Sequence, residues 1–159
     1  MGFQKLSEKI VKVLERVTSK EYCDKYSQIL ADQIKKRAQL GYGVDVEGGQ
    51  QKKFRPLKPS TIASREYAQR IGELSPNTTP RTANVTRTGQ LINSITPNGS
   101  PGHIGVTLTE SRDDGKLNVD IVGYLEEKGF SFLKEAGYEK EILERAIRND
   151  IEELLKTID

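Results

Sequence analysis

Apolar residues recur at helical spacing near both ends of the chain. From residue 2 to residue 16, and again along a longer stretch that ends near Leu40, they fall on one side of a helix. Gly41 follows directly and can take the left-handed conformation with which many helices end. From 138 to 158 a broad apolar stripe predicts an amphipathic helix. The pattern therefore predicts a helical N-terminal part over residues 1–40, including one long helix, and a C-terminal helix over 138–158.

Two short runs between these helices have the alternation of a β-hairpin. Apolar residues alternate with small or polar ones over 104–108 and again over 117–121, and Asp114-Gly115 between them is a favoured hairpin turn. We therefore expect an antiparallel hairpin over 103–124. The predicted fold class is α+β, in which the N-terminal helices precede a small antiparallel β-hairpin sheet and the C-terminal amphipathic helix packs on that sheet.

The remaining segments are rich in glycine, proline and threonine, and they predict flexible loops at 41–56 and 75–87. Between these loops, Pro59 and Ser60 indicate the start of a helix, with Ser60 as its N-cap. Thr88 is placed to cap a further short helix that carries Leu91.

Composition narrows the possible functions. The 159 residues fit a single domain over 1–159, and only 35% of them are apolar while 30% are charged. The single cysteine rules out an internal disulfide, and with only one histidine a Cys/His zinc site or a histidine-centred triad is implausible without partner chains. No run of about 18 apolar residues is present to cross a membrane, and the Lys- and Glu-rich start does not match a secretory signal. We therefore expect a protein that starts life in a cytoplasm and has no membrane partner.

Charge is distributed unevenly although the net charge is only +2. Residues 51–90 hold eight basic side chains and two acidic ones, whereas residues 125–159 hold ten acidic and six basic ones. A basic middle and an acidic end can complement each other between neighbouring copies.

Two motifs carry the most specific information. They are FRPLKPSTIA at 54–63 and TRTGQLINSI at 86–95. The prolines of the first predict a stiff, extended entry into a helix, and the second predicts a capped short helix. Taken separately, each motif contains only residues that are common at the start or the end of a helix.

In this order and spacing, the two motifs resemble the virion-morphogenesis and tail-completion family of tailed bacteriophages. Its members carry a PLSPSTI segment and then L-x-x-TG-x-L-x-x-SI before a β-hairpin and a C-terminal helix; Lys58 stands here where serine is usual. The matching positions are Pro56, Leu57, Pro59, Ser60, Thr61, Ile62, Thr88, Gly89, Leu91, Ser94 and Ile95.

The resemblance implies a structural virion protein of the neck, without enzymatic activity or cofactor, that forms a ring and joins tail to head. Its partners would be further copies of itself and other neck, head-connector or tail-terminator proteins. The candidate contact residues are Lys52, Lys53, Phe54, Arg55, Pro56, Leu57, Ser60, Thr61, Arg81, Arg87, Thr88 and Gly89.

The alternative is a nucleic-acid-binding module that uses the basic segment 52–87, either as its function or as non-specific contact with DNA passing through the neck. Only Phe54 and Tyr67 are aromatic in that segment, which is few for a surface that stacks bases. A carboxylate hydrolase is the third reading. Its candidate pairs, Asp113-Asp114 and Glu126-Glu127, are expected to be solvated.

Overall fold

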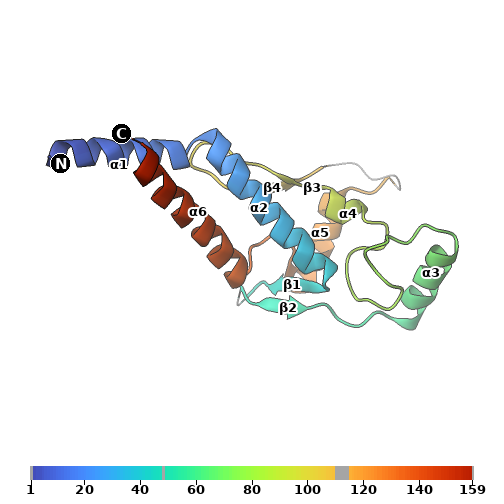
Figure 1. Cartoon of the computed structure of the whole chain (residues 1–159). Helices are drawn as coiled ribbons and strands as arrows, with labels where there is room; N and C mark the ends of the chain where they lie inside the picture. The colour runs from blue at the N-terminus through green and yellow to red at the C-terminus, as the bar shows by residue number, and fades with distance from the viewer. Residues whose placement is uncertain (1, 48, 110–114, 159) are drawn as a thin grey trace.

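The computed structural model describes residues 2–47, 49–109 and 115–158, and these form an α+β fold, as predicted. Figure 1 shows an elongated molecule with both chain termini toward one end and a helix carried on loops at the other. In chain order the elements are α1 (Phe3–Val17), α2 (Lys20–Gln39), β1 (Tyr42–Asp45), β2 (Gln51–Lys53), α3 (Pro59–Arg70), α4 (Gln90–Asn93), β3 (Ile95–Pro97), β4 (Val106–Leu108), α5 (Asn118–Glu127), β5 (Phe130–Ser131) and α6 (Gly137–Thr157).

The central element is α2, which contacts α1, α4, α6 and strands of both sheets. Its apolar positions recur at helical spacing, so that Leu30, Ile34 and Ala38 face one core together with Ile92 and Phe132. Gly41 follows the helix with φ 90°, as its position after Leu40 predicts. The long helix predicted in the N-terminal part is therefore confirmed.

Two small antiparallel sheets flank α2. One has the strand order β2-β1-β5 and the other pairs β3 with β4. The 41–56 segment, expected to be a flexible loop, therefore contains a β-hairpin, with Tyr42 opposite Lys53. Its alternation is too short to predict from sequence, because only the Gly43-Val44 pair of β1 is buried and every residue of β2 is exposed.

The predicted hairpin over 103–124 is wrong in its pairing. Val106–Leu108 pairs with the preceding strand Ile95–Pro97, and residues 118–127 form the helix α5 instead of a second strand. Asn118 and Val122 are the residues of α5 that are buried, a spacing of four that suits a helix and not a strand. The Asp114 position of the predicted turn lies outside the described residues.

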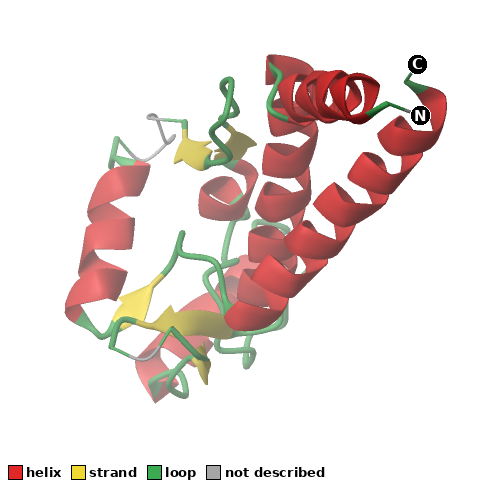
Figure 2. Ribbon diagram, turned by 90° about the vertical axis from the view of Figure 1, so that its left-hand side faces the viewer, coloured by secondary structure: helices red, strands yellow, loops and turns green. Residues whose placement is uncertain are grey.

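The C-terminal helix exists as predicted, but it packs chiefly on α1 and α2 and not on a sheet. The strands are two to four residues long, too short to cover a helix of 21 residues, whereas α2 offers a face of comparable length. Figure 2 shows α6 beside α2, with α1 crossing near the top.

A buried ion pair joins α2 to α6. Arg37 donates to the Glu139 carboxylate at 2.5 Å and to the carbonyls of Phe132 and Lys134 at 2.7 and 3.0 Å. The same carboxylate accepts the Ala136 N–H at 2.8 Å. Burial raises the pKa of Glu139 and lowers that of Arg37, while the attraction between the two charges opposes both shifts. The pair fixes the 132–136 connection against the core.

The helix α3 stands apart from the other elements (Figure 1). Among the described residues, no other helix or strand makes an extensive contact with it, and it packs on loops. Pro59 occupies its first turn and Lys58 its N-cap position, so the predicted helix start is confirmed and the assignment of Ser60 as N-cap is wrong.

Candidate subunit-contact groove

The first motif segment and the loop that precedes the second meet in a groove at the α3 end of the molecule. One side of the groove is formed by residues 53–61 and the other by the 81–85 loop, and α5 adds Tyr124 and Lys128. The hollow has two connected parts of about 430 and 620 Å³, which share Phe54, Pro56 and Ala83 in their linings. We call this hollow the basic groove.

The floor of the basic groove belongs to the core. Phe54 is buried, and its ring lies 5.0 Å from that of Phe130 with a tilt of 58°. Its backbone N–H donates to the carbonyl of Gly41 at 2.8 Å, which ties the end of β2 to the end of α2. These contacts fix the position of Phe54, the residue from which the chain runs toward α3.

Arg65 holds α3 against the opposite side of the groove. Its side chain is 4% exposed and donates to the carbonyls of Thr82 and Asn84 at 2.8 and 2.6 Å and to the Asn84 side-chain oxygen at 3.3 Å. Asn84 in turn donates from its amide to the carbonyl of Gln39 at 2.9 Å. A continuous polar chain thus links α3, the 75–87 loop and the end of α2.

The 75–87 loop passes very close to the backbone of Gly41. A Cβ added to Gly41 would lie 2.8 Å from the carbonyl oxygen of Ala83, and the residue has φ 90°. Only glycine fits a position that combines this conformation with this contact. The glycine that ends α2 therefore also lets the 75–87 loop lie across it.

The rim of the groove carries charge of one sign. Every charged side chain among the described residues that line it is basic and exposed: Lys53, Arg55, Lys58, Arg81 and Lys128. Arg81 lies 3.6 Å from Glu66 of α3, and the Lys128 ammonium lies 5.2 Å from the centre of the exposed Tyr124 ring. An apolar floor below a basic rim suits an acidic, partly apolar occupant.

Most of the candidate contact residues line this groove, and a minority lie elsewhere. Those in the lining are Lys53, Phe54, Arg55, Pro56, Leu57, Thr61 and Arg81. Ser60, Arg87 and Thr88 are exposed outside it, and Lys52 lies over the Phe130 ring, 3.8 Å from Asp45. Gly89 is buried at the start of α4 with φ 80°, so it shapes the backbone and offers no contact surface.

The basic surplus counted over 51–90 is smaller at the surface than in the sequence. Arg65 contributes to that count, yet its guanidinium is buried and bonded to carbonyls. Burial lowers the pKa of Arg65, and the nearby Arg87 lowers it further. Conversely, sequence reasoning missed Tyr124 and Lys128, because residues 117–121 were expected to form a strand and α5 was not foreseen.

No protein-family model, curated protein or solved structure matches this chain. The resemblance to the tail-completion family therefore stays a prediction. In the described part of the chain, no helix is long and apolar enough to cross a membrane, and no group of three or more His, Cys, Asp or Glu side chains is arranged to hold a metal ion. Glu126 and Glu127 are exposed on α5 outside the groove lining, and Asp113-Asp114 lies outside the described residues.

Proposed function

We propose that this chain is a structural subunit of a phage neck, a tail-completion or head–tail connector protein that assembles into a ring and joins tail to head. The observation that supports it is the basic groove. The two segments that resemble the family motifs are far apart in sequence, and one of them forms a side of the groove while the other begins directly after the 81–85 loop.

The groove suits a protein partner because it joins apolar and charged surface. Leu57 is half-buried and Pro56 and Tyr124 are exposed, so a partner that covers them removes apolar surface from water. The basic rim would attract an acidic partner and orient it, an effect that acts mainly on the association rate and on specificity. The acidic C-terminal part of a neighbouring copy, or an acidic surface on another neck protein, has the required charge.

Nucleic-acid binding is the second candidate, and the uniform sign of the rim favours it. Tyr124 beside Lys128 adds an exposed aromatic residue to those counted from the sequence. Phe54 is buried below the groove, however, and is not available to stack on a base. Binding that depends on phosphate contacts would weaken steeply with salt.

Complementation with groove variants tests the proposal. A phage that lacks the gene would be supplied with wild-type protein, with the double variant Arg55→Glu/Lys58→Glu, or with Arg70→Glu. Arg70 is an exposed cation at the C-terminal end of α3 and lies outside the groove lining, so it is the control. We expect wild-type protein and the control to restore joined particles, and the double variant to leave filled heads and free tails.

Joined, infectious particles formed with the double variant would contradict a contact role for the groove. The same three proteins are then titrated with labelled double-stranded DNA over a range of salt concentrations. If all three join particles, and the double variant alone loses a steeply salt-dependent affinity for DNA, the nucleic-acid reading replaces the neck contact.

A further inference from the structure

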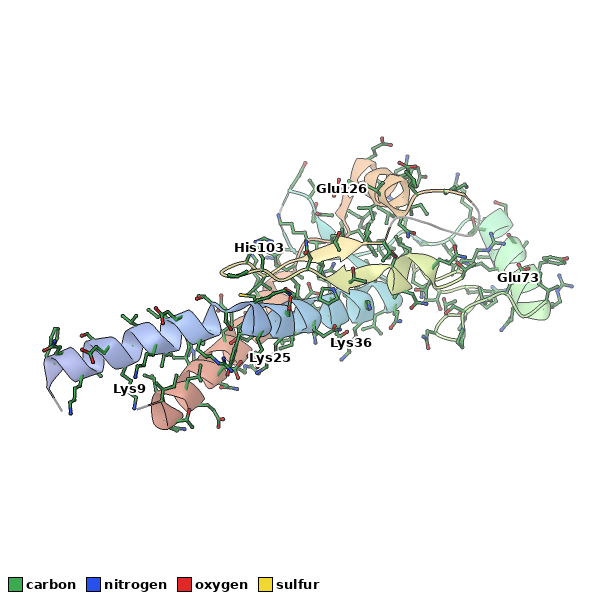
Figure 3. The ribbon with its side chains drawn as sticks, turned by 90° about the horizontal axis from the view of Figure 1, so that it is seen from above. Lys9, Lys25, Lys36, Glu73, His103 and Glu126 are labelled. Carbon is green, nitrogen blue, oxygen red and sulfur yellow. The ribbon has the colours of Figure 1, made fainter. Side chains whose placement is uncertain are left out.

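The apolar stripe of α1 extends beyond the part of the molecule that covers it. At the C-terminal end of the helix, Val13 and Val17 are 2% and 7% exposed. Toward the N-terminus the same stripe continues through Leu6 and Ile10, which are 45% and 44% exposed, to Phe3 at 88%. Figure 3 shows this half of α1, marked by Lys9, projecting past the rest of the chain at the end opposite to Glu73. We call Phe3, Leu6 and Ile10 the α1 ridge.

A second apolar feature, on α6, is left partly open. Leu143, Ile147 and Ile151 follow one another at spacings of four along the helix and are half-buried. They line two adjoining hollows of about 200 and 330 Å³, which share Ile147 and Glu144. We call this feature the α6 groove. None of the described residues that line the two hollows belongs to α1.

The charges beside the α1 ridge distinguish between its possible binding partners. Beside the stripe, a basic row follows one side of α1 at positions 5, 9, 12 and 16. Two copies of α1 packed antiparallel on each other would bring these basic rows together, which is unfavourable. The helix α6 has no such excess of positive charge: its exposed side chains are four acidic and four basic, and the charged residues that line the α6 groove are Glu135, Glu144, Lys140 and Arg148. The basic row of α1 would therefore meet a balanced surface there.

We propose that the α1 ridge of one copy packs into the α6 groove of a second copy. A row of apolar side chains on one helix filling a groove on another is the usual geometry of helix packing. The contact joins two different surfaces, so it is heterologous and can close into a ring. As the subunit interface of a neck ring it rests on the proposed function, but self-association can be measured without any phage component.

Cysteine trapping on the full-length chain tests the contact. Cys23 is the only cysteine and is buried, so Cys23→Ala gives a background without thiols. In that background Leu6→Cys and Ile147→Cys are made separately, purified, and oxidised mildly either alone or as an equal mixture. We expect a disulfide-linked dimer at least several-fold more abundant in the mixture than in either protein alone.

Light scattering after gel filtration gives the second readout. Leu6→Glu places a charge on the ridge and is expected to shift the wild-type oligomer toward monomer. Val11→Glu is the matched control, because Val11 is 52% exposed on α1 but lies off the stripe. Circular dichroism of both variants reports whether the helices remain folded.

Four outcomes would overturn the inference. Wild-type protein that is monomeric at high concentration has no such interface, and a dimer trapped in Leu6→Cys alone shows that α1 pairs with itself. Monomeric protein whose ridge binds vesicles containing anionic lipid shows that a membrane is the partner. Variants of the α1 ridge that lose self-association yet still restore head–tail joining would contradict the proposed neck ring. If no cross-link forms, but joining still depends on the residues of the basic groove, only the contact between the α1 ridge and the α6 groove is contradicted.

Discussion

The strongest structural test of the groove is the removal of Arg65. Arg65→Met keeps most of the apolar stem of the side chain and deletes the guanidinium that bonds Thr82 and Asn84. A hydrogen bond from a charged donor contributes about 1.5–3 kcal/mol, and loss of the donor leaves buried carbonyls without a partner. The three bonds share one side chain and the loop can relax toward water, so we expect a total of about 3 kcal/mol rather than their sum.

This loss should be local. Since α3 packs on loops and not on α2 or α6, it can detach without opening the core. Hydrogen–deuterium exchange measured by mass spectrometry would separate peptides of α3 and the 75–87 loop from those of α2 and α6. A local change of about 3 kcal/mol corresponds to roughly 100-fold faster exchange in α3 and the loop.

Arg70→Met is the control for this experiment, because Arg70 is an exposed cation on the same helix. It should leave exchange within a few-fold of wild type. Two results would refute the reasoning. Unchanged protection of α3 in Arg65→Met would show that other contacts hold the helix, and equal loss of protection in α2 and α6 would show that α3 is not a separate unit.

Three further predictions concern the stability of the folded chain. Arg37→Met leaves the Glu139 carboxylate buried without its ion-pair partner and should lower the free energy of unfolding in urea by about 3–5 kcal/mol. Burial, aided by a hydrogen bond to Asp150, raises the pKa of the Tyr26 hydroxyl above its ordinary value of 10. The stability that this group contributes is therefore fully present below pH 10 and is lost as the pH rises further. In thermal melts at alkaline pH, Tyr26→Phe should make the decline of stability with pH less steep. Gly99→Ala should destabilise by about 1–3 kcal/mol, because its Cβ would lie 2.6 Å from the backbone of α2, whereas Gly123→Ala, with open space around it, should stabilise α5 by about 0.5–1 kcal/mol in the same melts.

Long, strongly periodic helices were the part of the fold that sequence predicts best. The helix predicted over 2–16 spans Phe3–Val17, and that predicted over 138–158 spans Gly137–Thr157. Each has enough turns for its apolar stripe to exceed chance alternation. The strands are two to four residues long, so each has too few positions for its alternation of apolar and polar residues to be told from chance. Leu117 and Val119 alternate as in a strand, yet both are exposed in the structure.

Several residues that line the groove are among the candidates named from the sequence, but the groove itself is not predicted there. Proline and the basic residues of 53–61 mark an irregular, exposed segment, and the structure places it at the rim. What brings the second loop to it is a set of buried polar contacts from Arg65 and Asn84. From the sequence alone, an arginine is counted as surface charge and an asparagine as a loop residue. Whether such a polar side chain is buried depends on hydrogen-bond partners that are distant in the chain. The contribution of α5 is missed for a different reason, because the pattern over 117–121 predicts a strand where the structure has a helix.

Electron microscopy of lysates from a phage that lacks this gene tests the central claim most directly, with and without the protein supplied in trans. We expect DNA-filled heads and separate tails in the deletion lysate, and joined, infectious particles once the protein is supplied. Normal joined particles without the gene would contradict a neck function.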